Sequence, residues 1–166
     1  MPPIFTKHLA DRLDQVCKLK VHEAKAGDIL HPGGVWIAPG DYHLILERQQ
    51  TTVRLNVHQG PPENSCRPAV DVLFRSVAEL YGRSTLGVIM TGMGQDGLRG
   101  CEAIRDAGGT VLIQDEASSV VWGMPAAVSH AGLANRVASL DNIAAEIIRL
   151  TQQGRPTRTM PKEIGA

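Results

Sequence analysis

Residues 86–114 constrain the fold of this chain more than any other stretch. They read as a short apolar run, a glycine-rich turn, a segment with apolar residues every three to four positions, and a second apolar run. The middle segment, which ends at Gly108-Gly109, predicts a helix. A helix that connects two apolar strands is typical of a parallel βαβ unit with a right-handed crossover. We therefore predict an α/β fold with a mainly parallel sheet. Because sites in such sheets lie at the carboxyl ends of strands, we expect a functional site at the glycine turn.

Periodic segments precede this unit. Residues 44–46 and the alternating run 53–57 lie on either side of Gln49-Gln50, which predicts a β-hairpin. Helices are expected where apolar residues recur at helical spacing after Thr6 and after Pro68. Thr6 would cap the first of these helices, and Pro68 would occupy the first position of the second.

The carboxyl-terminal part is expected to add two helices and a tail. Pro125 predicts the start of a short helix, residues 135–140 a connection, and the apolar face of residues 143–151 a last helix. Residues 152–166 show no apolar period, which predicts a disordered tail. One domain is therefore expected over residues 1–151.

The composition excludes several classes of protein. Lysine plus arginine equals aspartate plus glutamate, 17 each, and no basic patch with aromatic residues occurs, which argues against nucleic-acid binding. No apolar stretch approaches the length of a membrane span, and the first residues do not resemble a signal peptide. Cys17, Cys66 and Cys101 form no CxxC pair, as expected in a reducing compartment. We therefore expect a cytoplasmic protein without direct membrane insertion.

The glycine turn, Gly92-Met93-Gly94-Gln95-Asp96-Gly97, admits three interpretations. It satisfies the G-x-G-x-x-G pattern of a dinucleotide cradle, but Asp96 would place a carboxylate where the pyrophosphate should bind. In a structural interpretation, Asp96 caps the following helix and the glycines only permit a tight turn. In a catalytic interpretation, Asp96 orients a histidine or acts on a substrate, while turn amides stabilise an oxyanion.

Side chains outside the turn indicate no second chemistry. The six histidines include no H-E-x-x-H motif and no paired spacing on a helix face, so no metal site is expected and most histidines are expected at the surface. Ser118 and Ser119 follow the second apolar run without a G-x-S-x-G elbow, and we interpret them as turn residues. Trp122 is expected in the core or in the wall of a cleft.

Five segments together carry a resemblance to a known family. They are residues 2–6 (PPIFT), 35–43 (VWIAPGDYH), 67–74 (RPAVDVLF), 90–97 (MTGMGQDG) and 114–125 (QDEASSVVWGMP). In this order they resemble the catalytic domain of CheB-type chemotaxis protein-glutamate methylesterases, from Met1 to about Leu150.

The resemblance implies a doubly wound, mainly parallel sheet with a β-hairpin. It also implies a serine hydrolase that removes methyl groups from glutamate methyl esters on methyl-accepting chemotaxis receptors, and often deamidates receptor glutamines, without a cofactor. The family uses a Ser-His-Asp triad, in which Asp96 matches the aspartate and the backbone N–H of Met93 matches a proposed oxyanion donor. We expect Gly92, Gly94, Trp122 and Met124 to line the cleft.

This sequence departs from the family pattern at its beginning. The family nucleophile lies in a Gly-x-Ser-Thr-Gly-Gly turn after the first strand, and the family histidine directly precedes the segment that matches Met1-Pro2-Pro3. Neither residue has a counterpart among the 166, and His8 lies one helical turn too late. A receiver domain has no counterpart either. We interpret this as a start codon assigned at an internal methionine, and expect a sheet that lacks the family's first strands.

Two other functions stay open on the sequence alone. A catalytically inactive domain that still binds the receptor predicts receptor affinity without methanol release. A dinucleotide-binding protein that uses the turn from Gly92 to Gly97 predicts NAD affinity, which the other interpretations do not.

Overall fold

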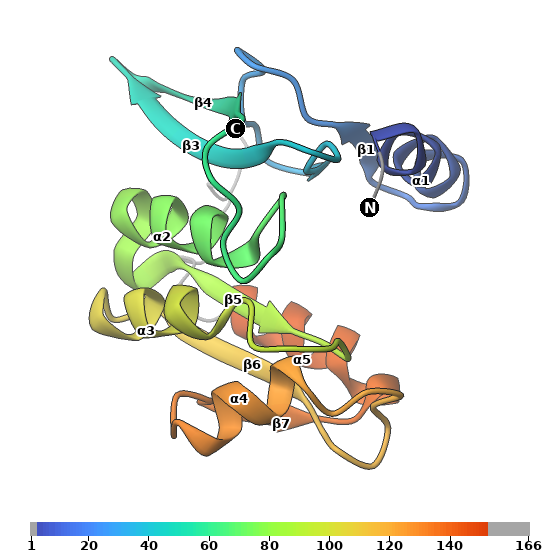
Figure 1. Ribbon diagram of the computed structural model, residues 1–166, viewed down its shortest axis with the longest axis vertical. Helices are drawn as coiled ribbons and strands as arrows, with labels where there is room; N and C mark the ends of the chain where they lie inside the picture. The colour runs from blue at the N-terminus through green and yellow to red at the C-terminus, as the bar shows by residue number, and fades with distance from the viewer. Residues whose placement is uncertain (1–2, 153–166) are drawn as a thin grey trace, which may run out of the picture.

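The computed structural model describes residues 3–152 as helices packed on both faces of a parallel sheet, with a β-hairpin beyond one of these helices (Figure 1). In chain order the elements are α1 (Pro3–Val16), β1 (Lys20–Glu23), β2 (Gly34–Ile37), β3 (His43–Gln49), β4 (Thr52–His58), α2 (Val70–Tyr81), the 3-10 turn η1 (Gly82–Ser84), β5 (Leu86–Ile89), α3 (Leu98–Asp106), β6 (Thr110–Gln114), α4 (Met124–His130), β7 (Arg136–Ala138) and α5 (Leu140–Gln152).

The predicted βαβ unit is the centre of the fold. Strands β5 and β6 pair in parallel, with α3 as the crossover, and β7 adds a third parallel strand beside β6. Along β6, Val111 and Ile113 face a core shared with α2, α3 and α4, whereas Leu112 faces α5 on the opposite side (Figure 1). Both faces of the strand are therefore buried, which explains why its sequence reads as a continuous apolar run.

The predicted hairpin is formed by β3 and β4, with a shift of one position. Gln49 pairs with Thr52, so the turn consists of Gln50 and Thr51. The hairpin packs on α2 through Leu73 and Val77, on the side of the helix that faces away from the parallel sheet (Figure 1). Helix α2 therefore contributes to two cores.

Two expected helix starts are wrong. Helix α1 begins at Pro3, and Thr6 lies inside it, where its hydroxyl accepts a hydrogen bond from Gly40 N–H at 3.0 Å and lies 2.7 Å from Glu23 Oε1. Helix α2 begins at Val70, two residues after Pro68. The Thr6 hydroxyl therefore ties α1 to the strand region instead of capping the helix.

Strand β7 was not expected, because residues 135–140 read as a connection. It has three residues, two of them exposed, so it carries no apolar pattern. The last helix extends to Gln152, one residue into the expected tail, and the rest of that tail lies outside the described residues. No helix among residues 3–152 is long and apolar enough to cross a membrane.

Candidate active site

The glycine turn lies at the carboxyl end of β5, next to the loop that follows β6. Gly92 N–H donates to Val121 O at 3.1 Å, and Gly92 O accepts from Met124 N–H at 2.8 Å. The buried Gln114 side chain at the end of β6 accepts from Thr91 N–H at 3.0 Å. These bonds join the two loops into one backbone surface at the edge of the sheet where sites are expected.

Two glycines permit this close approach. A Cβ on Gly123 would lie 2.6 Å from Gly92 O and 3.1 Å from Gly94 N, so any side chain there would displace the turn. A Cβ on Gly92 would instead meet the flexible thioether of Met124, at 2.5 Å from Sδ. The half-buried Trp122 and Met124 side chains both pack against the core below the turn.

Met93 lies at the exposed tip of the turn. Its side chain is 85% exposed, and within residues 3–152 no backbone acceptor bonds its N–H. Gly94 follows with φ +89°, a left-handed conformation that favours glycine. Among the described residues the Met93 N–H is therefore without a backbone acceptor, and it can bind an oxygen of a ligand.

Asp96 is buried, at 7% exposure, and its carboxylate binds backbone N–H groups. Oδ2 accepts from Val70 N–H at 2.7 Å, and Oδ1 accepts from Asp71 N–H at 3.1 Å and Gly97 N–H at 3.0 Å. Val70 and Asp71 are the first two residues of α2. Asp96 therefore caps α2, and the expectation that it caps the helix directly after it is wrong: the residue at that cap is Gly97, with no side-chain cap.

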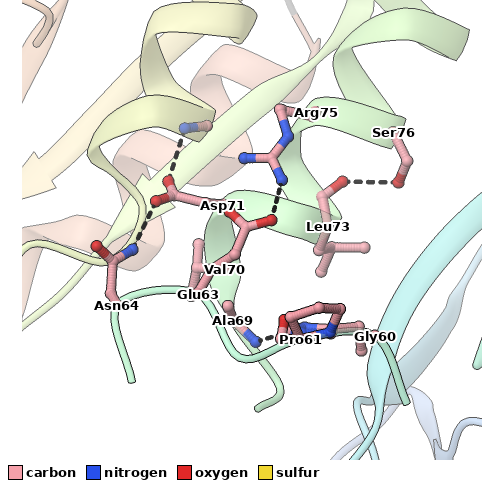
Figure 2. A network of polar contacts seen from close by, with 12 residues as sticks. Gly60, Pro61, Glu63, Asn64, Ala69, Val70, Asp71, Leu73, Arg75 and Ser76 are labelled. Atoms are coloured by element: carbon pink, nitrogen blue, oxygen red, sulfur yellow. Dashed lines mark hydrogen bonds and ion pairs between the residues drawn. The ribbon is translucent and has the colours of Figure 1, made fainter. Parts of the chain in front are cut away.

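The amino terminus of α3 binds a different carboxylate, that of Asp71. This side chain is 1% exposed, and its Oδ1 accepts from Gly100 N–H at 2.7 Å (Figure 2). Asp71 of α2 thus binds an N–H group of α3, and Asp96, two residues before α3 begins, binds two N–H groups of α2; we call this reciprocal arrangement the exchange of caps. Both negative charges are stabilised by the positive end of a helix dipole.

Asn64 connects the two carboxylates. Its amide nitrogen donates to Asp71 Oδ2 at 2.8 Å (Figure 2). The same nitrogen lies at a longer 3.4 Å from Asp96 Oδ1. Nearby, Arg75 pairs with Glu63; this pair raises the pKa of Arg75, and the charges of Asp71 and Asp96 add to the rise. Sequence reasoning missed both Asn64 and Asp71. The sequence gives only weak indications of them: Asp71 is an acidic residue in the first turn of a predicted helix, and Asn64 is a loop residue of a type that tolerates the left-handed conformation.

The histidines lie elsewhere: four of the six are exposed, as expected, and only His43 is buried. His43 is only 1% exposed: its Nδ1 accepts from Ala69 N–H at 3.2 Å, and its Nε2 lies 3.0 Å from Pro61 O, to which it donates. Both ring nitrogens are therefore occupied by the backbone. No histidine among residues 3–152 hydrogen-bonds Asp96, and these residues contain no cluster of three or more metal-ligating side chains.

Ser118 and Ser119 lie in the turn after β6, as predicted. The Ser118 hydroxyl bonds the Asp115 carboxylate and accepts from Leu140 N–H at 2.8 Å, at the start of α5. Ser119 donates to Asp115 O at 2.6 Å. Both hydroxyls are engaged in local structure, which does not suit a nucleophile.

The capping exchange also bears on the dinucleotide interpretation. At the start of α3, where a pyrophosphate would bind, the N–H of Gly100 is bonded to Asp71, and Asp96 lies one residue before the cap. Two buried carboxylates at this point oppose an anionic ligand.

The parallel sheet, the glycine turn at its carboxyl edge and the buried carboxylate define an α/β protein with an enzyme-like site. Sequence comparison specifies which one: the family model for CheB methylesterase matches residues 1–147. The chain belongs to the CheB methylesterase family.

Curated relatives and a solved structure agree with this assignment. The chain is 61% identical over 149 residues to the protein-glutamate methylesterase/protein-glutamine glutaminase of Trichodesmium erythraeum (strain IMS101), covering 90% of this chain and 42% of that protein. It is 50% identical over 157 residues to the protein of the same name from Nocardioides sp., covering 95% and 43%. The chain thus spans about two fifths of the length of these curated relatives.

The fold prediction is confirmed by the crystal structure of the Thermotoga maritima CheB methylesterase catalytic domain. It superimposes with a TM-score of 0.88 at 43% sequence identity, covering 90% of this chain and 79% of that one.

Proposed function

We propose that this chain forms part of a protein-glutamate methylesterase that hydrolyses glutamate methyl esters on methyl-accepting chemotaxis receptors. The family and the names of the relatives support this reaction. The observation that carries the proposal is the Asp96 carboxylate, buried and held by backbone N–H groups beside the glycine turn. Receptor cytoplasmic domains as substrates put the reaction in the cytoplasm.

In this proposal Asp96 orients a histidine. A carboxylate oxygen accepts about two hydrogen bonds, and among the described residues only Val70 N–H donates to Oδ2. Oδ2 can therefore accept from the ring N–H of a histidine while the other bonds keep the carboxylate fixed. An aspartate in this role fixes the tautomer of the histidine and stabilises the imidazolium that forms.

The remaining steps follow the Ser-His-Asp scheme. The serine oxygen attacks the ester carbonyl, the histidine takes the serine proton and passes it to the departing methanol, and water then hydrolyses the acyl-enzyme to the glutamate. We assign to Met93 N–H a hydrogen bond to the oxyanion of the tetrahedral intermediate. No cofactor takes part, and a glutamine substrate would release ammonia by the same steps.

Methanol release from a methylated receptor fragment tests this function. The natural full-length protein is expected to release methanol. A polypeptide of the 166 residues alone should stay at background, because they contain neither the family serine turn nor the family histidine, and loss of either group costs on the order of a million-fold in turnover.

Two outcomes would contradict the proposal. Receptor binding by the full-length protein without methanol release would favour an inactive receptor-binding domain. Saturable NAD binding that competes with the receptor fragment would favour the dinucleotide-binding interpretation, although the carboxylates at the start of α3 weigh against it.

A further inference from the structure

We propose that Asn64 and Asp71 are positioning residues that hold the Asp96 carboxylate in its reactive orientation. This inference rests on the proposed function, in which Asp96 orients a histidine. In this inference Asn64, in a surface loop, and Asp71, in the first turn of α2, contribute to the reaction without contacting the substrate.

The backbone around Asn64 is bent into a tight turn. Asn64 and Ser65 have φ of +49° and +60°, and Cys66 N–H donates to Glu63 O at 2.7 Å to close the turn. Two consecutive non-glycine residues in the left-handed region are uncommon and persist only where the surroundings enforce them. Here the ion pair between Glu63 and Arg75 anchors the turn to α2 (Figure 2).

The turn directs the Asn64 amide between two buried carboxylates. One N–H of this amide donates to Asp71 Oδ2 at 2.8 Å, and the other is available to Asp96 Oδ1 at 3.4 Å. An amide nitrogen has two hydrogens, so it can serve both acceptors at once. The Asn64 amide thus contacts both negative charges, and its contact with Asp96 Oδ1 is the third and longest beside those from Asp71 N–H and Gly97 N–H.

Asp71 fixes the backbone that carries Asp96. Its Oδ1 binds Gly100 N–H in the first turn of α3, while its own N–H donates to Asp96 Oδ1. Rotation of the Asp96 carboxylate would therefore break bonds to α2, and a shift of α3 would break the bond to Asp71. The orientation of Oδ2, the oxygen left for the histidine, is determined by this reciprocal arrangement.

A merely structural role would stabilise the fold without affecting the histidine. Positioning makes a different prediction: turnover and the state of the histidine ring change while the protein stays folded and substrate affinity is kept. The measurements are kcat and KM for methyl ester hydrolysis and the low-field proton resonance of a histidine ring bonded to a carboxylate.

The test compares Asn64→Gly with Ser65→Gly in the natural full-length protein. Glycine tolerates the left-handed conformation, so Asn64→Gly removes the amide without straining the turn. We expect kcat to fall roughly tenfold to a hundredfold at nearly constant KM, by analogy with the loss of hydrogen bonds that orient metal-binding side chains. The low-field resonance should shift or broaden. Ser65→Gly changes the adjacent residue of the same turn and should leave kcat, KM and the resonance unchanged.

Asp96→Asn is measured alongside these two variants and the wild-type protein. All measurements are made well below the lowest Tm of the four proteins, so that each is folded. If Asn64→Gly keeps the wild-type kcat and resonance while Asp96→Asn is inactive, the positioning role is overturned and the role of Asp96 stands. Equal losses in Asn64→Gly and Ser65→Gly would also overturn it, since the turn backbone would then be responsible. Full activity of Asp96→Asn would overturn the role proposed for Asp96 and this inference with it, whereas a wild-type protein that releases no methanol would overturn the proposed function itself.

Discussion

At the scale of single residues, Gly92 in the glycine turn and Gly123 in the neighbouring loop differ in which atoms an added Cβ would contact. At Gly123 a Cβ meets backbone atoms of Gly92 and Gly94, which cannot move without moving the turn. At Gly92 it meets the end of the Met124 side chain, which can change rotamer. The backbone angles of Gly123, φ −106° and ψ −73°, do not themselves require glycine.

We therefore expect Gly123→Ala to lower turnover of the full-length protein by up to roughly a hundredfold, because small displacements of a reactive geometry have effects of this size. Gly92→Ala serves as the matched control and should lose less. Steady-state kinetics on methylated receptor, with thermal melts to confirm folding, give the comparison. A larger loss in Gly92→Ala than in Gly123→Ala would contradict this description of the turn.

The cysteines provide a test that does not depend on function. Burial raises the pKa of the Cys101 thiol to about 12, and the Asp71 charge adds to the rise, so this thiol stays protonated at neutral pH. Cys17 and Cys66 are exposed. Iodoacetamide should therefore label Cys17 and Cys66 in the native protein and Cys101 only after unfolding, as read by peptide mass. Labelling of native Cys101 at the rate of Cys66 would show that the α2–α3 core is open.

The sequence predicted Asp96 as the key carboxylate but not its partners. A strand followed by a glycine turn identifies the position, because that rule is local. The capping of α2 depends on a contact across 25 residues, between Asp71 N–H and Asp96 Oδ1. No local pattern specifies such a contact. Asn64 was missed for the same reason, since its loop reads as exposed by composition.

At the scale of elements, the exchange of caps requires that α2 and α3 pack closely. Gly100 lies at their contact, and a Cβ there would be 2.5 Å from Phe74 Cβ, which belongs to the rigid base of that side chain. An added methyl group would therefore push the helices apart and lengthen the bond from Gly100 N–H to Asp71.

Gly100→Ala should accordingly lower the free energy of unfolding by about 1–3 kcal/mol, the usual cost of overpacking. Arg99→Ala, on the exposed side of the same helix, is the control and should stay within about 0.5 kcal/mol of wild type, since its ion pair with Glu102 is a surface pair. Urea unfolding of the variants measures the difference. A Gly100→Ala protein as stable as wild type would rule out the tight helix contact.

Helices and strands whose apolar residues recur regularly could be predicted from the sequence, and elements without such a pattern could not. The βαβ unit, the hairpin and the last helix were predicted because each buries a regular apolar pattern. Strand β7 is exposed at Arg136 and Val137 and depends on pairing with β6, so its sequence carries no such pattern. The early start of α1 was missed because Thr6 is used for a tertiary bond to Gly40 instead of a cap.

At the scale of the whole molecule, the parallel sheet has an open side. Among residues 3–152, β5 pairs only with β6, and its half-buried Leu86 and Val88 lie beside unpaired backbone groups. Such edges favour association. We expect a polypeptide of these 166 residues to associate with rising concentration, measured by light scattering. A monomeric protein with a cooperative melt at all concentrations would contradict this expectation.

The central claim is that Asp96 has two roles, capping α2 and orienting a histidine. Asparagine has one carbonyl oxygen, so Asp96→Asn cannot keep bonds to both Val70 N–H and Asp71 N–H, and a stability loss of about 1–3 kcal/mol is expected. Orientation of the histidine predicts a much larger effect on the reaction, because the amide stabilises the wrong tautomer.

The most direct measurement is kcat for methyl ester hydrolysis by full-length Asp96→Asn, made below its Tm, where the variant is folded. We predict a decrease on the order of ten-thousand-fold relative to wild type. A folded variant with kcat within a factor of about ten of wild type, a change equivalent to only about 1.4 kcal/mol in the barrier, would contradict the account and leave Asp96 with its capping role alone.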